Sequence, residues 1–231
     1  MFPNHIAIIL DGNRRYAKKH NLASHKGHEQ GAKTLKTILE HLDTTPTSQC
    51  TLYAFSTENF KRSEAEKSAL FTLFEEAANQ LLKRKDELLK KDVRVQFIGN
   101  VTRFPEHIQQ LTKKIADLTQ HCQKKTLNIC FGYGGRDEIT HAVQTIAKQV
   151  ENGTLRAADI SEQTIEQSLY LSTSPDLVIR TGGAKRLSNF LPWQSAYSEW
   201  FFTNTLWPEM TTQEMDAIIE EFGKRKRNFG K

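Results

Sequence analysis

The chemistry of this chain is expected where an apolar run near its start ends in a polar turn. The run His5–Leu10 is followed at once by an acid, a glycine, an amide and two arginines, residues 11–15. Such a run is typical of a buried strand, and open α/β folds bind ligands just beyond strand ends. A carboxylate that can bind Mg²⁺ beside two guanidinium groups suits a bound diphosphate. Asp-Gly-Asn is also ordinary turn chemistry, and the adjacent arginine pair is what favours the ligand site.

A second polar loop follows the apolar run Gln49–Phe55. Residues 56–62 bring hydroxyl, carboxylate, amide, aromatic and guanidinium groups together in one short stretch. The loop is interpreted in two ways. Ser56 and Thr57 are suited to capping a following helix, and the same loop is suited to forming a polar floor for a reacting substrate, with Arg62 as a third arginine for phosphate.

A third polar loop follows the run Asp176–Arg180. Arg180 ends a buried strand, where an arginine is costly unless an anion pairs with it. A Gly182-Gly183 turn follows, flanked by Arg180 and Arg186, with Ser188 behind it. Gly-Gly alone is weak evidence, but with these arginines the turn favours a diphosphate cradle.

Two single residues add weaker signals. His28 follows Gly27 at an expected helix start, where it is suited to donating to a phosphate, although a lone histidine is more often structural. Glu199 precedes an apolar run, and alone it is most often a structural ion-pair acid.

Strand-like and helix-like segments alternate along the chain and must position these residues. The alternation predicts an α/β fold with a mostly parallel six-stranded sheet and helices on both faces. The predicted strands are His5–Leu10, Gln49–Phe55, Val93–Gly99, Leu127–Phe131, Asp176–Arg180 and Trp200–Thr203. The predicted helices are Gly27–Leu42, Ser63–Lys91, Pro105–Gln123, Asp137–Asn152, Ser161–Leu171 and Thr211–Gly223.

The long predicted helix Ser63–Lys91 carries an apolar stripe, Leu70 to Leu89. A stripe of this kind is usually part of a core. A helix of this length could equally wall an elongated apolar cavity, and the sequence leaves the two interpretations open.

Composition limits the function classes. The chain has 231 residues with 38% hydrophobic and 26% charged residues, which is typical of a globular protein, and residues 1–231 are expected to form a single domain. No apolar stretch approaches the length of a membrane span, and no signal peptide precedes His5. The three cysteines lack metal-site spacing and are expected to be reduced thiols of an intracellular protein. Dinucleotide, P-loop, paired-cysteine zinc and aspartate-rich DDxxD motifs are absent from the sequence.

The net charge of +5 admits nucleic acid, anionic lipid or phosphorylated small molecules as partners. The basic run Lys224–Arg227 is by itself more often a solvated end. A nucleic-acid-binding protein would need stacking aromatics among exposed basic residues, and no such module is present, so we expect no nucleic-acid partner.

Taken together, the motifs resemble one known family, the cis-prenyltransferases, which include undecaprenyl and dehydrodolichyl diphosphate synthases. The resemblance runs from His5 to Gly230 and rests on the blocks HIAIILDGNRRYAKK, GHEQG, LYAFSTENFKR, LNICFGYGGRDEI, PDLVIRTGGAKRLSNFLPWQ, AYSEWFF and LWPE. It implies a Mg²⁺-dependent enzyme that condenses isopentenyl diphosphate repeatedly onto an allylic diphosphate primer, farnesyl or geranylgeranyl diphosphate. It also implies a homodimer in the cytoplasm, peripheral contact with a membrane, and an elongated apolar tunnel for a long polyprenyl diphosphate that is a precursor of glycosyl carrier lipids.

The resemblance assigns roles to residues by motif position. Asp11 resembles the essential acid that handles Mg²⁺ and the leaving diphosphate, and Glu199 resembles the second acid of the metal site. Asn59 resembles a residue assigned to proton removal. The positions that resemble the substrate sites are Gly12, Asn13, Arg14, Arg15, Tyr16, Ser24, His28, Ser56, Thr57, Glu58, Phe60, Arg62, Arg180, Arg186 and Ser188.

The chain departs from the family pattern twice. Ser24 stands where the family often has an arginine. The C-terminal Arg-x-Gly, which can reach a neighbouring subunit's isopentenyl site, is Asn228-Phe229-Gly230 here, which puts that contact in doubt.

Two alternatives inside the family remain. One is a non-catalytic partner subunit, which is disfavoured because Asp11 and the arginines are retained. The other is an enzyme with a short product or an unusual acceptor. The segment between Phe60 and Val93, which is charged near Lys83–Lys91, resembles the extended form of dolichol-type members and implies a long product. The small Ala54 also leaves room for a growing chain.

Overall fold

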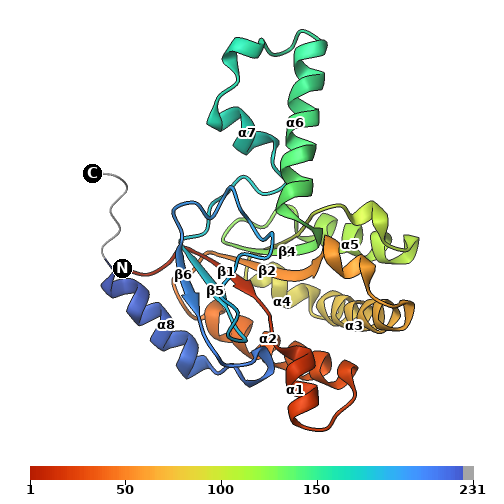
Figure 1. Cartoon of the computed structure of the whole chain (residues 1–231), viewed down its shortest axis with the longest axis vertical. Coiled ribbons are helices and arrows are strands. Elements are labelled where there is room, and N and C mark those ends of the chain that lie inside the picture. Colours follow the sequence, from red (N-terminus) through yellow and green to blue (C-terminus); the bar gives the residue numbers. More distant parts are fainter. Residues whose placement is uncertain (226–231) are drawn as a thin grey trace.

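The computed structural model describes residues 1–225 and shows a parallel sheet covered by helices (Figure 1). Its strands are β1 (His5–Ile9), β2 (Gln49–Ser56), β3 (Val93–Ile98), β4 (Lys125–Tyr133), β5 (Leu177–Arg180) and β6 (Glu199–Phe202). The strand order is β3-β4-β2-β1-β5-β6, and each neighbouring pair is parallel. The predicted fold class and six strands are confirmed, with ends shifted by one or two residues.

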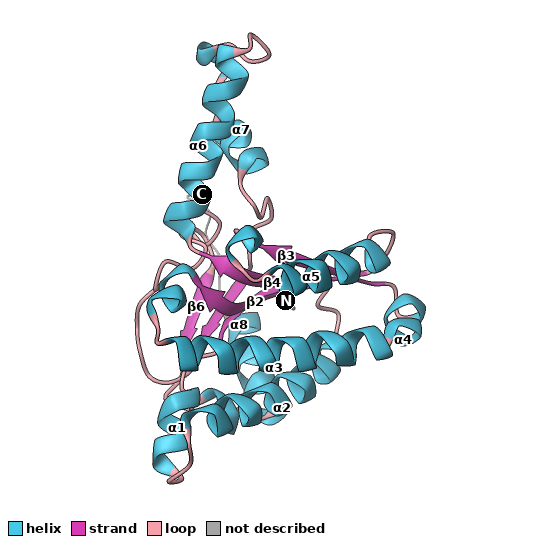
Figure 2. Ribbon diagram, turned by 90° about the vertical axis from the view of Figure 1, so that its right-hand side faces the viewer, coloured by secondary structure: helices cyan, strands magenta, loops and turns pink. Residues whose placement is uncertain are grey.

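Helices cover both faces of the sheet, as the alternation predicts. They are α1 (Asn13–Lys19), α2 (Ser24–Asp43), α3 (Glu64–Lys83), α4 (Lys85–Lys90), α5 (Glu106–Thr119), α6 (Gly135–Glu151), α7 (Glu162–Ser168) and α8 (Thr212–Lys224). Figure 2 shows α2 and α3 beneath the sheet, while α6 and α7 project from the opposite side. None of the helices among residues 1–225 is long and apolar enough to cross a bilayer.

The core divides at the sheet because successive side chains of a strand point to opposite faces. Ile6 and Ile8 of β1 pack in the cluster that includes Ile38 of α2 and Ile219 of α8. Ala7 of the same strand packs on the other face, with Phe190 and Leu191 among its neighbours.

The helices differ from the sequence prediction in two places that matter for the site. The short helix α1 follows the first polar turn directly, and α2 begins at Ser24, three residues before the predicted start at Gly27. The predicted helix Ser63–Lys91 is two helices, α3 and α4, with the break at Arg84. Ser63 caps α3 by accepting a hydrogen bond from the backbone N–H of Glu66 at 3.3 Å.

Topology brings the three polar loops together. β2, β1 and β5 are neighbours in the sheet, and all run in the same direction. The loops that follow Ile9, Ser56 and Arg180 therefore leave the same carboxyl edge.

Candidate active site at the carboxyl edge of the sheet

Asp11 joins the first polar turn to the double-glycine turn. One carboxylate oxygen accepts from Nη2 of Arg15 at 2.9 Å, and the other accepts from Nη2 of Arg180 at 2.9 Å. Arg15 belongs to α1 and Arg180 ends β5, so residues far apart in sequence form one cluster. The first polar turn and the double-glycine turn therefore lie side by side at this edge of the sheet.

Arg180 is the buried centre of this cluster, with only 4% of its surface exposed. Its Nη1 donates to the backbone oxygen of Arg186 and to Oγ of Ser188, both at 2.6 Å. The sequence predicted that an arginine here requires an anion, and Asp11 supplies it. Arg180 also holds the backbone of Arg186 in place, while Arg186 itself is exposed to solvent.

Gly182 is required by the close approach of this turn to Asp11 and Arg15. Its φ is +80°, and an added Cβ would lie 2.4 Å from a guanidinium nitrogen of Arg15 and 2.9 Å from the backbone oxygen of Asp11. Its own carbonyl accepts a hydrogen bond from Nη1 of Arg15 at 2.5 Å. A side chain at this position would push the two turns apart.

Two glycines of α2 let that helix pack against the start of α1. A Cβ at Gly27 would lie 2.0 Å from the backbone oxygen of Asn13, and one at Gly31 would lie 2.1 Å from its Oδ1. The side chain of Asn13 in turn donates to the carbonyl of Leu10 at 3.1 Å. The close packing of Gly27 and Gly31 on Asn13 places His28, which lies between these glycines in sequence, in the lining of the cavity described below.

The electrostatics around His28 favour a neutral imidazole. Burial lowers the pKa of His28 to about 4, and the guanidinium groups of Arg62 and Arg14 add to the effect against the opposing carboxylate of Glu66. A cationic histidine would be repelled by these arginines, whereas a neutral one can donate a hydrogen bond. Glu66 lies 3.6 Å from Arg14.

The loop after β2 is a short 3₁₀ helix, residues Thr57–Lys61, closed by its own side chains. The amide oxygen of Asn59 accepts from the backbone N–H of Ser56 at 3.0 Å, and the Ser56 side chain caps the same turn. The capping interpretation of this loop is therefore confirmed for Ser56. Asn59 uses its amide oxygen to hold the loop.

Two other residues of this loop have structural partners. Glu58 accepts from Nδ2 of Asn189 at 3.2 Å, which ties the loop to the turn after β5. Burial opposes its ionisation, but hydrogen bonds from Asn189 and from its own loop outweigh this and lower the pKa of Glu58. Phe60 packs in an aromatic cluster, with ring centroids 4.9 Å from Phe55 and 5.0 Å from Phe104.

A cavity of about 1030 Å³ begins at this edge and continues between α2, α3 and the sheet. Leu73, Phe74, Ala77 and Leu81 of α3 line it, so the apolar stripe walls a cavity as well as contributing to the core. The predicted site residues that line it are Asp11, Gly12, Asn13, Arg14, Arg15, His28, Ser56, Asn59 and Arg62.

Other predicted substrate residues lie outside the cavity lining. Tyr16 packs on His20, with ring centroids 4.3 Å apart. Ser24 is exposed at the first position of α2, and Thr57 lies against Gly134. The C-terminal segment Asn228–Gly230 is outside the described residues.

Glu199 requires a correction. It begins β6 and pairs in register with Leu177, whereas Asp11 follows the opposite end of β1. Five residues of strand separate the two levels, roughly 16 Å at the usual rise per residue. Glu199 instead accepts from Nη1 of Arg225 at 2.8 Å. The two carboxylates therefore do not share a metal site within one chain. The two residues lie at opposite ends of parallel strands.

Three residues that sequence reasoning did not select also build the site. The hydroxyl of Thr181 donates to the backbone oxygen of Asp11 at 2.7 Å, and the backbone N–H of Trp207 donates to the same oxygen at 3.0 Å. Asn189 accepts from the backbone N–H of Arg136 at 2.9 Å and donates to Glu58. Thr181 follows Arg180 and Asn189 follows Ser188 in the sequence. This adjacency to predicted site residues is the only sequence feature that points to them. Trp207 is buried, and no pattern in the sequence marks its backbone as part of the site.

Comparison with known proteins adds the family. Residues 9–230 match the family model described as "Putative undecaprenyl diphosphate synthase". A "Tritrans,polycis-undecaprenyl-diphosphate synthase (geranylgeranyl-diphosphate specific)" of Archaeoglobus fulgidus is 41% identical over 227 residues, covering 97% of this chain and 90% of that protein. An "Isoprenyl transferase" of Thermotoga maritima is 42% identical over 231 residues, covering 99% and 97%.

Two solved structures are similar to this chain over nearly all of its length. Lavandulyl diphosphate synthase from Lavandula x intermedia, in complex with dimethylallyl diphosphate, has a TM-score of 0.93 and 34% identity, covering 100% of this chain and 99% of that one. A probable undecaprenyl diphosphate synthase from Campylobacter jejuni has a TM-score of 0.81 and 35% identity, with 99% of each chain covered.

Proposed function

Because this chain belongs to the cis-prenyltransferase family, the polycis-prenyl diphosphate synthases of undecaprenyl type, we propose that its carboxyl-edge site extends an allylic diphosphate primer with isopentenyl diphosphate. One observation carries the proposal more than any other. The carboxylate of Asp11 lies between Arg15 and Arg180, so guanidinium groups from two turns converge where a large apolar cavity begins.

The two substrates are assigned to the two turns. The allylic diphosphate binds the turn after β1, where the start of α1 offers backbone N–H groups and where His28 and Arg62 line the same cavity. Isopentenyl diphosphate binds the turn after β5, clamped by Arg186 and Ser188 around the buried Arg180.

The donor groups fit Mg²⁺ that is bound together with substrate. Asp11 is the carboxylate at the centre of the cluster, and residues 1–225 contain no group of three or more histidine, cysteine, aspartate and glutamate side chains suited to a metal. Mg²⁺ commonly takes one or two carboxylates and completes its oxygen shell with substrate phosphates and water. Asp11 would hold it, and the ion would offset the negative charge of the leaving diphosphate.

The reaction needs charge stabilisation and orientation from the protein. The bond between C1 and the diphosphate oxygen of the primer breaks, and C4 of isopentenyl diphosphate forms a bond to C1. A proton leaves C2 of the added unit to give the cis double bond. Arg14, Arg15 and Arg62 stabilise the diphosphate that departs, while Arg186 and Ser188 keep the diphosphate of the elongated product.

The proton has a better acceptor than the side chains at this site. The amide oxygen of Asn59 is used by the backbone of Ser56, and an amide is a poor base. The pKa of His28 is held at about 4. A phosphate oxygen with a second pKa of about 6 is a stronger base, so we assign the proton to the departing diphosphate. Asn59 then acts as a positioning residue.

The cavity is assigned to the growing prenyl chain, with farnesyl or geranylgeranyl diphosphate as primer. Its apolar wall and its volume of about 1030 Å³ support a long product, a precursor of a glycosyl carrier lipid. The likeness to lavandulyl diphosphate synthase favours a second candidate, a short product from a short primer. Measuring the chain length of the product distinguishes these two candidate functions.

We also propose a cytoplasmic homodimer that touches a membrane only at its surface. Support comes from the apolar product and from the projecting helix α6, on which Val143 is 57% exposed. Light scattering after gel filtration measures the dimer, and flotation with phospholipid vesicles measures the membrane contact.

The test is incorporation of labelled isopentenyl diphosphate with Mg²⁺ and primers of several lengths. Native enzyme should form products extended by several units. Asp11→Asn should lose turnover with an unchanged circular dichroism spectrum, while Asp117→Asn, which breaks an exposed ion pair with Lys113 on α5, should keep it. Normal turnover of Asp11→Asn would refute the assignment.

A further inference from the structure

The far end of the cavity is polar, although its middle is apolar. Lys125 begins β4 and Asp43 ends α2, so both lie at the amino edge of the sheet, opposite the edge that carries Asp11. From His28 to Asp43, α2 rises about 22 Å at the usual 1.5 Å per residue. Both residues nevertheless line the same cavity as Asp11.

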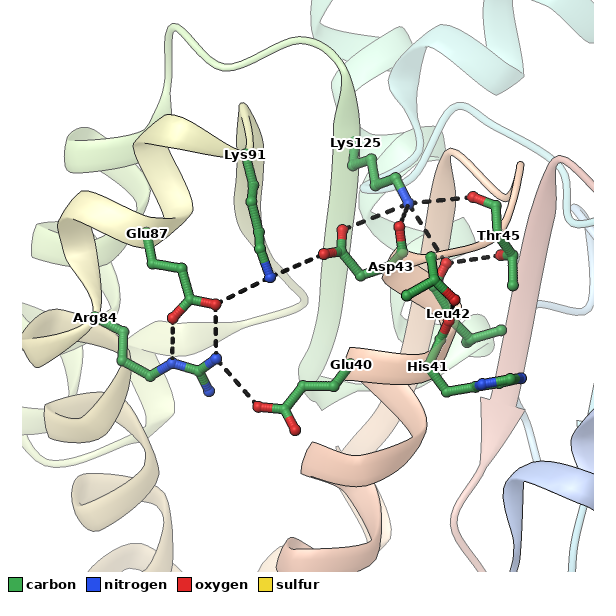
Figure 3. Close-up of polar contacts among 10 residues, drawn as sticks. Glu40, His41, Leu42, Asp43, Thr45, Arg84, Glu87, Lys91 and Lys125 are labelled. Atoms are coloured by element: carbon green, nitrogen blue, oxygen red, sulfur yellow. Dashed lines mark hydrogen bonds and ion pairs between the residues drawn. The ribbon is translucent and has the colours of Figure 1, made fainter.

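Six charged side chains line this end and pair with one another; we call them the distal ion-pair cluster. They come from α2, from the α3–α4 break and the end of α4, and from the start of β4: Glu40, Asp43, Arg84, Glu87, Lys91 and Lys125. Figure 3 shows them facing one another between α4 and the C-terminal end of α2.

Two carboxylates act as the hubs of the cluster. Glu87 accepts from Nε of Arg84 at 2.7 Å and lies 2.9 Å from Nζ of Lys91. Asp43 lies 2.9 Å from the same Lys91 nitrogen and 3.4 Å from Nζ of Lys125. Lys91 therefore links the two hubs across the end of the cavity.

The ends of the cluster are fixed to the fold. Arg84 reaches back to Glu40 of α2 at 3.1 Å. Lys125 donates to the carbonyl of Asp43 at 2.5 Å and so satisfies a free carbonyl at the end of α2. The break between α3 and α4 falls at Arg84. Glu87 lies in the short helix beyond that break, and Lys91 directly follows the helix.

Their neighbours favour the charged forms of Glu87 and Lys91. Hydrogen bonds from Arg84 and then Lys91 lower the pKa of Glu87 to about 2. The pKa of Lys91 is raised, chiefly by its hydrogen bond to Asp43. Single exposed ion pairs contribute little to stability, but here each hub shares two cations in one network.

We propose that the distal ion-pair cluster is a polar stop that sets the length of the prenyl chain. This inference rests on the proposed function, because it requires an isoprenoid chain in the cavity. A hydrocarbon tip that reaches Glu87 and Lys91 can replace none of their hydrogen bonds, so further growth must separate opposite charges. Beyond them lies water, since Glu40 is 47% exposed at its side chain.

The cluster could serve only to tie α2 to α4, and the variants are chosen to separate the two roles. Glu87→Leu with Lys91→Leu removes one acid and one base, and so leaves the net charge unchanged. The pairs Arg84–Glu40 and Lys125–Asp43 remain. Glu87→Gln with Lys91→Gln removes the same charges but keeps the end polar. Arg156→Leu with Asp159→Leu removes an exposed 2.7 Å ion pair that does not line the cavity.

Product alcohols are sized by mass spectrometry after incubation with labelled isopentenyl diphosphate, and the rate of the first condensation is measured separately. The leucine pair should shift the most abundant product upward by at least one isoprene unit, more than the glutamine pair does, with the first condensation unchanged. The Arg156 and Asp159 variant should give the native length. A polar stop also predicts longer native products in high potassium chloride, because salt screens half-exposed ion pairs.

The outcomes are distinguishable. No incorporation by native enzyme refutes the proposed function itself. Incorporation with the same product length in native enzyme and in the leucine pair refutes the polar stop alone. If the leucine pair fails to fold by circular dichroism, an unchanged product length of the native enzyme in high potassium chloride refutes the polar stop.

Discussion

Replacing Arg180 by methionine tests how the two turns depend on one another. Arg180 is 4% exposed and donates to Asp11, to the backbone of Arg186 and to Ser188. Methionine keeps similar length without any donor. The turn after β5 loses its anchor, and Asp11 keeps only Arg15.

The expected loss follows from these contacts. A hydrogen bond to a charged group contributes about 1.5–3 kcal/mol. Losing one such contact at the isopentenyl diphosphate site should lower kcat/KM for that substrate by about ten- to a hundredfold, since about 1.4 kcal/mol is a factor of ten. Stability should fall by less than about 2 kcal/mol, because an apolar replacement also removes the cost of burying a charge.

The assay is the initial rate against isopentenyl diphosphate concentration at saturating primer, with thermal unfolding measured in parallel. Arg180→Lys is the matched control, because it keeps the charge but lacks the planar fork that reaches Asp11, Arg186 and Ser188 together. Its kcat/KM should lie between native and Arg180→Met. Native kinetics in the methionine variant would refute the reasoning that Arg180 joins the turns.

Three further predictions concern other parts of the fold. His5 is 2% exposed, and burial lowers its pKa to about 4 from an ordinary 6.5. The buried neutral imidazole is therefore fully compatible with the fold above pH 6.5. Roughly 3 kcal/mol of the free energy of unfolding should be lost as the pH falls from 6.5 toward 4. Thermal unfolding across this range measures it, and His5→Gln should show a flatter profile. Gly27→Ala places a methyl group 2.0 Å from the backbone oxygen of Asn13, so α1 must shift, with a loss of about 1–3 kcal/mol and reduced turnover. Gly153→Ala, whose methyl group meets nothing within 4 Å, should keep native turnover, and equal activity of the two glycine variants would contradict the close-approach argument. Gly182→Ala should weaken isopentenyl diphosphate binding, measured as a higher KM, because its Cβ would lie 2.4 Å from Arg15; an unchanged KM would contradict the role of that turn.

The sequence predicts the sheet and its polar edge well because both depend on local patterns. An apolar run that ends at Asp11 or Arg180 is visible without knowledge of the fold. Parallel strand order then brings the two residues together at 2.9 Å. Residue chemistry predicts that the buried Arg180 requires an anion, but only the structure identifies Asp11 as that anion.

The failures concern features that depend on tertiary structure. Glu199 resembles a metal ligand by motif position, yet it stands at the beginning of β6. A second metal ligand beside Asp11 would have to follow the end of a strand. The break at Arg84 is not marked by proline or glycine. It becomes intelligible only when the cluster with Glu87, Lys91 and Asp43 is seen in three dimensions.

The most direct test of the central claim is a crystal structure of the enzyme with Mg²⁺, isopentenyl diphosphate and a thio analogue of the allylic primer. The account predicts one diphosphate at the turn after β1 and the other at the turn after β5, with Asp11 between them. The prenyl tail should lie in the cavity and point along α3 toward Arg84. Diphosphates bound at separate surfaces, or a tail that lies outside the cavity, would contradict it.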